Sequence, residues 1–435
     1  MITEHTKYIL TDAINNNNKF WEYEINDDTS LTYRWGRVGT TGQSKSESTF
    51  SRSSLNKKIS EKTSKGYVKV DIVASKNSVT PVSKEALSKT IIKQAVTEQF
   101  CQDQSDPILM ALVNRLVDTN RHEIVKSTGG MMNVDISTGI ISTALGVVSK
   151  DSIITAKDLL DGMTPFVIGK DLDNPDYLKL LNKYMMKIPQ KVGSSRGWHK
   201  YFLSDATSLQ KQSTLLDQLE ASVDLAVSRI ANAPATSAAD HPKPIFDVKL
   251  NICTDKDVIK MITDKFNSTL QQQHVSARLK PLRIFEVEIP EMKKAYDADG
   301  AKLSKQELLW HGTRVFNVLS ILKNGLIIPP TRGGTYQIAG RMFGNGIYTA
   351  ISSSKSLNYS FGYWDGGPRD NNCFMFLCDV AMGNYYTPKS SSESLPKAGY
   401  DSTWAIPGKS GIQNDEIIVY RTSQCNIRYL IEFGE

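Results

Sequence analysis

Hydrophobic residues follow three different patterns along the 435-residue chain. In residues 1–73, apolar and polar positions alternate with a period of two, which predicts short strands separated by Asn, Asp and Gly turns. The predicted strands are Tyr8 to Leu10, Phe20 to Ile25 and Leu31 to Val38. A helix is predicted from Ser51 to Lys65. This part of the chain therefore predicts a small antiparallel β-sheet with one helix.

The pattern changes to a helical period of three to four between residues 104 and 232. One predicted helix has an apolar face made by Ile108, Leu109, Leu112, Leu116 and Val117. A longer helix has the same spacing at Leu209, Leu215, Leu219, Val223, Val227 and Ile230. Because such faces must pack against neighbours, this segment predicts an all-α helical bundle. Residues 74–103 and 233–245 lack a sustained apolar period and predict linkers.

Strand-like runs return after residue 245. They are Phe246 to Ile252, Leu282 to Ile289, Cys373 to Val380, Glu416 to Tyr420 and Ile427 to Phe433. Short helices are predicted at Asp255 to Asn267, Val315 to Asn324 and Ser352 to Tyr359. Residues 246–435 thus predict a mainly antiparallel mixed α+β domain, and the whole chain predicts a multidomain α+β protein.

Composition narrows the class of protein. With 40% hydrophobic and 23% charged residues, the chain is typical of folded globular proteins. No apolar run approaches the roughly 18 residues that span a bilayer, and the N-terminus lacks the pattern of a secretion signal, so no membrane partner is expected. The five cysteines are scattered without CxxC spacing, which indicates a reducing compartment and no structural metal.

Three C-terminal segments contain residue types that can carry chemistry. In Leu308-Leu-Trp-His-Gly-Thr-Arg314, a strand ends at His311 and Gly312, where an accessible backbone amide and carbonyl suit a planar carboxamide. The third segment contains Glu416 at the start of a buried strand, where a carboxylate can stabilise an oxocarbenium-like transition state. Taken singly, each of these residues has a commoner structural explanation, a satisfied structural histidine for His311 and a solvated acid for Glu416.

The second segment, Gly340-Arg-Met-Phe-Gly-Asn-Gly-Ile-Tyr-Thr-Ala350, is rich in glycine around Tyr348. Tyr348 and Tyr359 could sandwich an aromatic ring, and Ser356 could add a hydroxyl to the same ligand. The alternative is a glycine-rich turn with tyrosines of the core.

In this order and at this spacing, the three segments resemble the catalytic domain of poly(ADP-ribose) polymerases, from about Phe246 to Phe433. The resemblance implies an NAD⁺ ADP-ribosyltransferase with NAD⁺ as substrate and no metal. The catalytic residues that it implies are His311, Tyr348, Lys355 and Glu416. The NAD⁺-binding residues that it implies are His311, Gly312, Thr313, Tyr348, Ser356 and Tyr359. Ile327 and Ile351 stand where the family usually has a basic and an acidic residue.

The resemblance also implies a role for each of these side chains. His311 would hold the adenosine ribose, and Gly312 and Ser356 would bind the nicotinamide carboxamide. The rings of Tyr348 and Tyr359 would stack on nicotinamide. Glu416 would bind the 2′-hydroxyl of the nicotinamide ribose, and Lys355 would lie beside the acceptor.

An N-terminal segment, Tyr33-Arg-Trp-Gly-Arg-Val-Gly-Thr-Thr-Gly-Gln43, resembles a WGR domain. By that resemblance, Trp35 would stack on a sugar at a DNA end and Arg37 would bind phosphate, with Arg34 beside them. Core packing is the structural alternative for Trp35. Further basic residues in this part of the chain are Arg52, Lys57, Lys58, Lys62, Lys65 and Lys69, and they make it the best candidate for phosphate contact.

The helical segment completes the resemblance. Leu180 to Pro189 and Ala206 to Leu219 resemble the helical regulatory domain of the same polymerases, which implies that NAD⁺ is blocked until DNA loosens this domain. No zinc-finger module precedes the WGR segment, so a compact form of the family is expected.

The expected function is DNA-break-activated transfer of ADP-ribose to protein acceptors, including the chain itself, and extension into poly(ADP-ribose) in the response to DNA damage. The alternatives are a mono-ADP-ribosyltransferase and a non-catalytic scaffold that holds DNA ends. A nuclear location is expected in a eukaryote, and a cytoplasmic one otherwise.

Overall fold

The computed structural model describes residues 2–70 (apart from 14, 16, 27, 28 and 39), 106–134, 141–143, 146–192, 196–231, 247–328, 342–364 and 368–435. The chain divides into two compact units, one formed by Met1–Leu87 with His122–Val223 and the other by Ser88–Arg121 with Asp224–Glu435. The division falls inside helices α3 (Pro107–Ser127) and α7 (Ala206–Ala231). The linkers predicted at 74–103 and 233–245 lie outside the described residues.

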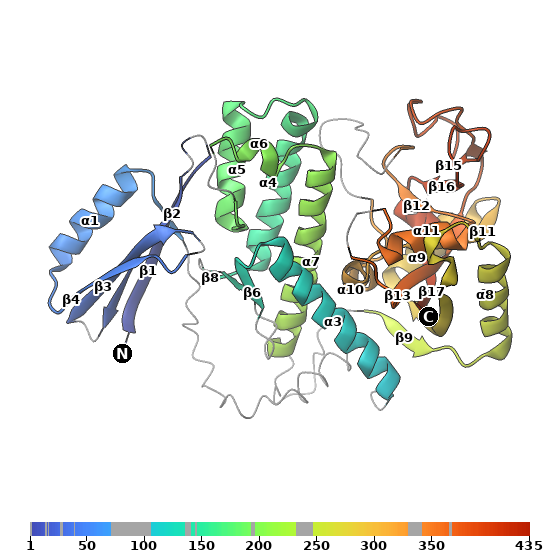
Figure 1. Ribbon diagram of the computed structural model, residues 1–435, viewed down its shortest axis with the longest axis horizontal. Coiled ribbons are helices and arrows are strands. Elements are labelled where there is room, and N and C mark those ends of the chain that lie inside the picture. The colour runs from blue at the N-terminus through green and yellow to red at the C-terminus, as the bar shows by residue number, and fades with distance from the viewer. Residues whose placement is uncertain are drawn as a thin grey trace. The chain divides into compact units, whose positions relative to one another are not determined.

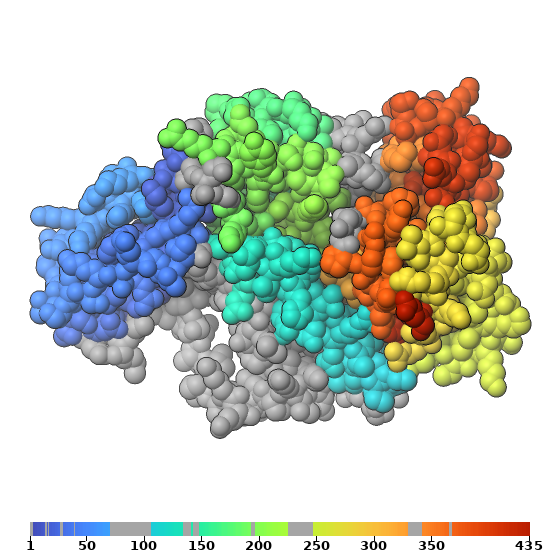
Figure 2. Space-filling view, in the orientation of Figure 1, coloured from blue at the N-terminus to red at the C-terminus, as the bar shows by residue number. Residues whose placement is uncertain are grey.

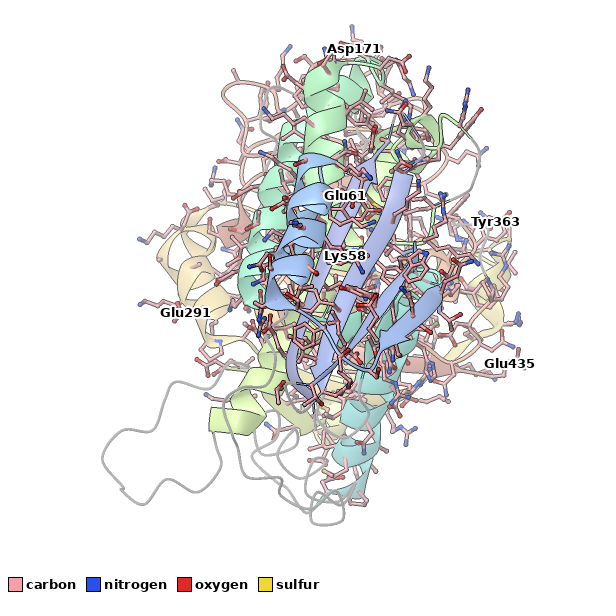
Figure 3. All side chains as sticks on the ribbon, turned by 90° about the vertical axis from the view of Figure 1, so that its left-hand side faces the viewer. Lys58, Glu61, Asp171, Glu291, Tyr363 and Glu435 are labelled. Carbon is pink, nitrogen blue, oxygen red and sulfur yellow. The ribbon has the colours of Figure 1, made fainter. Side chains whose placement is uncertain are left out.

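The N-terminal strands form an antiparallel sheet in the order β4-β3-β2-β1-β5 (Figure 1). The strands are β1 (Ile2–Asp12), β2 (Asn17–Asn26), β3 (Ser30–Arg37), β4 (Gln43–Glu47) and β5 (Val68–Val70). Helix α1 (Arg52–Ser64) covers one face of the sheet, as Figures 1 and 3 show from two sides. Leu55 of α1 is buried there with Trp21 and Tyr33 of the alternating strands, which confirms the predicted sheet and helix.

Charged residues occupy the sheet face turned away from α1. Glu22 of β2 lies 2.9 Å from the ammonium of Lys7 on β1 and 3.4 Å from the imidazole of His5. Burial alone would raise the pKa of Glu22, but hydrogen bonds from His5 and Lys7 lower it to about 2 from an ordinary value of 4.5. The paired carboxylate therefore stabilises the sheet whenever it is ionised.

We expect Glu22→Gln to lower the free energy of unfolding of this sheet at neutral pH by roughly 2–3 kcal/mol. The contribution of the ionised carboxylate is complete above pH 4.5 and is lost as the pH falls from 4.5 towards 2, because the unfolded chain takes up the proton first. Urea titrations at several pH values should therefore show a flatter acid decline in the variant. A decline as steep as that of the unmodified chain would contradict this assignment.

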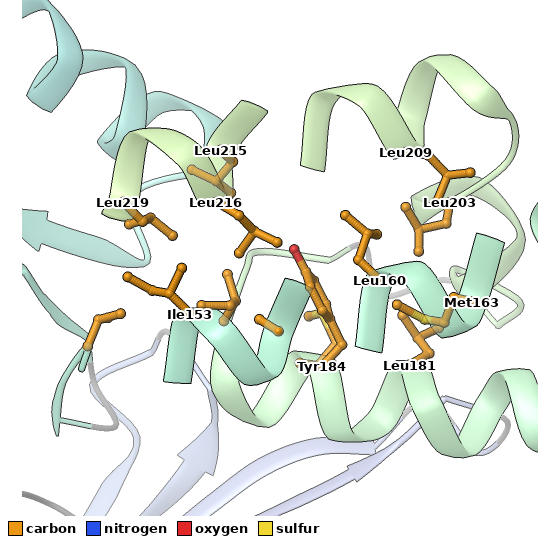
Figure 4. Close-up of a cluster of buried hydrophobic side chains, with 14 of the residues drawn as sticks. Ile153, Leu160, Met163, Leu181, Tyr184, Leu203, Leu209, Leu215, Leu216 and Leu219 are labelled. Atoms are coloured by element: carbon orange, nitrogen blue, oxygen red, sulfur yellow. The ribbon is translucent and has the colours of Figure 1, made fainter. Parts of the chain in front are cut away.

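Helices follow in the first unit. They are α4 (Lys150–Ile168), α5 (Pro175–Lys187), the short α6 (His199–Phe202) and the greater part of α7. Figure 4 shows Ile153 and Leu160 of α4 meeting Tyr184 of α5 and Leu216 of α7 in a buried core. The Tyr184 hydroxyl donates to Gln212 at 2.8 Å, so the polar end of this ring is satisfied.

A small sheet interrupts the segment predicted to be all-helical. It is made of β6 (Met132–Val134), β7 (Ile141–Thr143) and β8 (Gly146–Val147), in that order. The all-α prediction missed it, because strands of two or three residues are too short to establish a period of two.

The N-terminal sheet packs directly on this helical part within the first unit. Ile9 and Phe20 of the sheet are buried with Met131. The backbone N–H of Ala13 donates to the Asn182 side chain on α5 at 3.1 Å. The loop after β1 is therefore fixed to a helix of the bundle.

The second unit contains two sheets, which can be followed in Figure 1. The first has the order β11-β13-β17-β10-β9, with β9 (Lys249–Ile252), β10 (Lys280–Glu288), β11 (Gln306–Gly312), β13 (Cys373–Ala381) and β17 (Cys425–Gly434), and all its pairs are antiparallel. The second has the order β12-β16-β15-β14, with β12 (Ile347–Thr349), β14 (Tyr385–Tyr386), β15 (Ser402–Ala405) and β16 (Glu416–Val419). The predicted mainly antiparallel α+β domain is confirmed.

Helices surround these sheets. They are α8 (Lys256–Ser268), α9 (Pro290–Ala298), α10 (Val315–Asn324) and α11 (Ser353–Phe361). Phe266 of α8, Leu357 of α11 and Met375 of β13 are buried in one hydrophobic core. Helix α11 is unusual because its polar residues are buried: Ser353, Ser354, Lys355, Ser356 and Asn358. A buried polar helix requires hydrogen-bond partners along its length, and these partners position the candidate site.

Candidate active site

The three predicted catalytic segments meet where the two sheets of the second unit join. Trp310 of β11 and Ala350, which follows β12, exchange two backbone hydrogen bonds of 3.0 Å. The His311 ring nitrogen Nδ1 lies 2.8 Å from the Tyr348 carbonyl oxygen. Strand β12 pairs with β16, so that Tyr348 lies opposite Ile418, two residues from Glu416. His311, Tyr348 and Glu416 therefore lie on three neighbouring strands.

His311 has a defined proton arrangement. A carbonyl oxygen can only accept, so Nδ1 must donate its proton to Tyr348. Burial lowers the pKa of His311 below its ordinary 6.5, and the nearby positive charge of Lys355 lowers it further, although the bond to Tyr348 opposes this. The imidazole is therefore neutral at neutral pH, and its Nε2 can accept a hydrogen bond from a hydroxyl.

Glu416 forms an ion pair with Lys355, which is also one of the predicted catalytic residues. The ammonium lies 2.9 Å from a Glu416 carboxylate oxygen, and both side chains are largely buried. The same ammonium lies 5.5 Å from the centre of the Tyr359 ring. Burial raises the pKa of Tyr359 to about 12, with a further contribution from the negative charge of Glu416. These three side chains form one electrostatic cluster.

Gly312 allows α11 to approach the end of β11. A Cβ atom at this position would lie 1.7 Å from the carbonyl oxygen of Ser356, so no other residue fits. The Ser356 hydroxyl donates to the Trp310 carbonyl at 3.2 Å. The next backbone N–H, that of Thr313, donates to the Ser360 hydroxyl at 3.1 Å. Packing alone thus requires this glycine, whatever else it binds.

The predicted aromatic pair differs in exposure. Tyr359 is 38% exposed as a residue, so a flat ligand can lie against the exposed part of its side chain. Tyr348 is partly buried; its hydroxyl donates to the Gly344 carbonyl at 2.7 Å and accepts from the Phe343 N–H at 2.9 Å. Through these two hydrogen bonds, Tyr348 also fixes the described part of the glycine-rich segment, at Phe343 and Gly344.

Two residues of the cluster were missed by sequence reasoning. The Asp415 carboxylate accepts the backbone N–H groups of Ile351 at 2.7 Å and Ser352 at 3.2 Å. Ser352 caps α11, so Asp415 fixes the start of the helix that carries Lys355. The sequence predicts a role only for its neighbour, Glu416. Asp415 supplies a carboxylate at Ile351, where the family usually has an acid.

His274 is the other missed residue. Its Nδ1 lies 2.9 Å from the Ser354 hydroxyl on α11. Burial lowers the pKa of His274, and the charge of Lys355 adds to this effect, although a hydrogen bond with Asn414 opposes it. No feature of the sequence around His274 pointed to this position.

The three predicted DNA-binding residues do not share one surface. Trp35 and Arg37 are two residues apart on β3, so their side chains point to the same face of the sheet. Trp35 is 36% exposed, so the core-packing alternative does not describe it. Arg34 points to the opposite face, where its guanidinium lies 3.9 Å from both Glu22 and Glu24. Trp35 and Arg37 are therefore the pair that can contact a ligand together.

Two contacts join helices α3 and α7 to the sheets and helices of the second unit. Arg115 of α3 donates to Asn372 at 2.7 Å and to the buried Glu432 of β17 at 3.3 Å. Asp224 of α7 forms an ion pair with Lys323 at the end of α10, and both side chains are more than nine-tenths buried.

Neither a metal centre nor a membrane span was found in the part of the chain that the structure describes. No group of three or more His, Cys, Asp or Glu residues there is arranged to hold a metal ion. None of the described helices is long and apolar enough to cross a bilayer. Cys253, Cys373, Cys378 and Cys425 carry free thiols, whereas Cys101 lies outside the described residues.

Comparison with known proteins gives two domain matches. The poly(ADP-ribose) polymerase catalytic domain matches residues 256–407, and the WGR domain matches residues 6–73. Protein mono-ADP-ribosyltransferase PARP3 of Homo sapiens is 25% identical over 97% of this chain and 86% of its own length. Poly(ADP-ribose) polymerase 1 of Gallus gallus is 25% identical over 97% of this chain and 44% of its own length. Poly(ADP-ribose) polymerase 2 of Arabidopsis thaliana is 23% identical over 97% and 71%.

Proposed function

Because the chain belongs to the poly(ADP-ribose) polymerase family and is an NAD⁺ ADP-ribosyltransferase, we propose that a DNA end activates it to modify protein acceptors, including itself. The observation that carries the proposed chemistry is the Lys355–Glu416 pair, 2.9 Å apart, on elements adjoining His311. The match to the catalytic domain of an enzyme family argues against the alternative, a non-catalytic scaffold that holds DNA ends.

Glu416 assists the bond-breaking step. Its carboxylate accepts a hydrogen bond from the 2′-hydroxyl of the nicotinamide ribose and stabilises the positive charge that develops on the sugar. The bond between the anomeric carbon and the nicotinamide nitrogen breaks, a nucleophilic atom of the acceptor bonds to that carbon, and its proton is released. Lys355 orients the carboxylate by a charge-assisted hydrogen bond and lies on the acceptor side.

The remaining residues bind NAD⁺. In neutral His311, Nδ1 carries the proton that is donated to the Tyr348 carbonyl, so Nε2 is unprotonated. Nε2 therefore accepts a hydrogen bond from a hydroxyl of the adenosine ribose. The exposed ring of Tyr359 stacks on nicotinamide, with the Tyr348 ring on the other side. Gly312 and Ser356 bind the carboxamide, and Thr313 lies next to them in the chain.

We expect Asp415→Asn to lower kcat by about tenfold with a smaller change in KM for NAD⁺. An amide oxygen retains one of the two bonds to the start of α11, but the NH₂ group cannot accept the other. Lys355 and Ser356 then lose their fixed position while the groups that bind the adenosine half are unchanged. Initial rates over a range of NAD⁺ concentrations measure both constants. Unchanged kcat with raised KM would contradict a positioning role.

DNA acts through the helical segment. The N-terminal sheet, which carries Trp35 and Arg37, packs on α5 through Ala13 and Asn182 within the first unit. Helices α3 and α7, which continue from that unit, provide the contacts of Arg115 and Asp224 to the catalytic domain. A DNA end shifts the helical segment from a state that blocks NAD⁺ to one that admits it. The enzyme then acts where DNA is, in the nucleus of a eukaryote and otherwise in the cytoplasm.

Labelled NAD⁺ incubated with the full chain and a panel of DNA ends tests activation. Release of nicotinamide should rise at least tenfold when broken duplex is added, whereas closed circular DNA should have little effect. A rate independent of DNA would overturn the proposed activation and leave the transferase assignment intact.

The length of the product separates two forms of this function. We propose extension into poly(ADP-ribose), in the response to DNA damage. The competing form stops after one unit, and the name of the 25% identical human relative, a mono-ADP-ribosyltransferase, favours it. Gel separation of the labelled products decides between a ladder and a single added unit.

A further inference from the structure

Exposed aromatic side chains continue from Tyr359 beyond the end of α11. Tyr363 and Trp364 come directly after Gly362, the residue that ends the helix, and they are 38% and 50% exposed. The segment around α11 is orange in Figure 2, which shows part of it at the surface of the second unit. Clusters of exposed aromatic rings, unlike single ones, mark surfaces with a binding role. The cluster adjoins the candidate active site because Tyr359 belongs to both.

The three rings contact one another in sequence. The centroid of Trp364 lies 6.1 Å from that of Tyr359, with planes inclined by 45°. Tyr363 meets Trp364 edge-on, at 4.7 Å and 85°. Separations of about 4.5–7 Å with tilted or edge-to-face planes are the favourable arrangements of aromatic pairs. The Tyr359 ring is therefore contacted by the Trp364 indole as well as by the ammonium of Lys355.

A tight backbone turn brings Trp364 back to the helix. Gly362 has a φ of +86°, in the left-handed region that glycine adopts without strain. The backbone N–H groups of Gly362 and Tyr363 both donate to the Asn358 carbonyl, at 3.1 and 2.9 Å. The chain is thereby directed back towards the last turn of α11, where Tyr359 lies.

Arg369 holds this turn from a second side. Its guanidinium donates to the Gly362 carbonyl and lies 5.1 Å from the centre of the Tyr363 ring. The next residue, Asp370, donates its backbone N–H to the Phe361 carbonyl at 3.0 Å. Tyr363 is therefore fixed by the end of α11 and by Arg369, and it in turn supports Trp364.

We propose that Trp364 is a positioning residue of the nicotinamide-binding site, which holds the Tyr359 ring in the orientation that stacks on nicotinamide. The inference rests on the proposed function, in which Tyr359 binds that ring. A side chain that is ordered before the ligand arrives loses less rotational freedom on binding, so the affinity is higher. Trp364 acts through Tyr359 and does not itself have to contact NAD⁺.

We expect Trp364→Ala to raise KM for NAD⁺ by about three- to tenfold, the range that the loss of one aromatic pair gives. The value of kcat should be nearly unchanged, because the stacked ring binds nicotinamide in the ground state and in the transition state alike. Trp364→Phe keeps a ring at this position and should recover most of the affinity. Initial rates with broken DNA present measure both constants.

Isothermal titration calorimetry with the full chain and broken DNA separates positioning from general damage. Nicotinamide should bind Trp364→Ala three- to tenfold more weakly than the unmodified chain, because it uses the Tyr359 ring. ADP-ribose, which lacks nicotinamide, should bind both proteins equally, because its adenosine ribose is assigned to His311. Equal weakening of both ligands, or unchanged binding of nicotinamide, would overturn the proposal.

Tyr400 provides a matched control. It is 41% exposed, lies in the same unit and pairs with Tyr386 at a centroid distance of 5.3 Å. Tyr400→Ala therefore removes a comparable exposed ring pair without removing the contact of Trp364 with Tyr359. Its KM for NAD⁺ should equal that of the unmodified chain. A rise as large as that of Trp364→Ala would show that the effect is not particular to Trp364 and would contradict the proposal.

A Tyr359→Ala variant separates this inference from the function on which it rests. If Tyr359→Ala binds nicotinamide as tightly as the unmodified chain, the assigned role of Tyr359 fails, and the role of Trp364 fails with it. If Tyr359→Ala weakens nicotinamide binding and Trp364→Ala does not, the role of Tyr359 stands and that of Trp364 is wrong.

Discussion

Replacement of Glu416 by glutamine is expected to reduce kcat for ADP-ribose transfer by about 100- to 1,000-fold, the loss that follows removal of one group stabilising a developing charge. The amide has almost the same shape, so NAD⁺ can still bind. It carries no negative charge, however, and cannot stabilise the positively charged sugar. It also replaces the charged partner that Lys355 contacts at 2.9 Å, and the loss should appear mainly in kcat.

Measurement of nicotinamide release and of product length in the presence of broken DNA tests this expectation. DNA affinity should remain near that of the unmodified chain, because Glu416 lies in the second unit and the proposed DNA contacts lie on β3 in the first. Glu307→Gln, an exposed carboxylate on β11, is the matched control and should retain activity. Transfer by Glu416→Gln at more than a tenth of the normal rate would refute the assigned role.

Asp224→Asn is expected to raise activity without DNA by at least tenfold. Asp224 and Lys323 form a buried ion pair between α7 and the catalytic domain. The neutral amide removes a charged partner from the buried Lys323, and breaking a buried ion pair costs about 3–5 kcal/mol in comparable sites. The penalty applies to the arrangement in which the helical segment is docked, so the equilibrium moves towards the open, NAD⁺-accessible state, and each 1.4 kcal/mol is about tenfold.

A second aspartate of α7 gives the control. Asp217 pairs with Lys157 of α4 at 2.8 Å, entirely within the first unit. Asp217→Asn makes the same chemical change on the same helix but does not remove a contact with the catalytic domain, so DNA-free activity should stay low. Nicotinamide release should be measured with and without broken DNA. If Asp224→Asn remains as dependent on DNA as Asp217→Asn, the ion pair does not hold the blocked state.

Elements with a long and regular pattern could be predicted because their own residues determine them. Helix α10 has the predicted bounds, Val315–Asn324, and β13 extends the predicted strand by one residue to Ala381. Helix α9 (Pro290–Ala298) was missed, although Pro290 directly after the predicted strand is a typical first residue of a helix.

Interactions between distant residues could not be predicted in the same way. The partnership of Asp415 with the backbone of Ile351, and of Asp224 with Lys323, depends on how the strands and helices pack. The placement of Arg34 could have been predicted, because alternation along a strand separates it from Trp35 and Arg37. Resemblance supplied the proposed roles of the candidate site, whereas the contacts among its residues had to come from the fold.

The junction between the two catalytic sheets limits how the site can open. Within the described residues, a bridge of one residue pair, Trp310 with Ala350, joins β11 to β12, with the His311–Tyr348 bond beside it. His311 belongs to one sheet, and Glu416 belongs to the other. Because a single bridge is a narrow junction, we expect the two sheets to be able to rotate slightly, which would change the gap between these side chains. Hydrogen–deuterium exchange at the amides of Trp310 and Ala350 would report that motion.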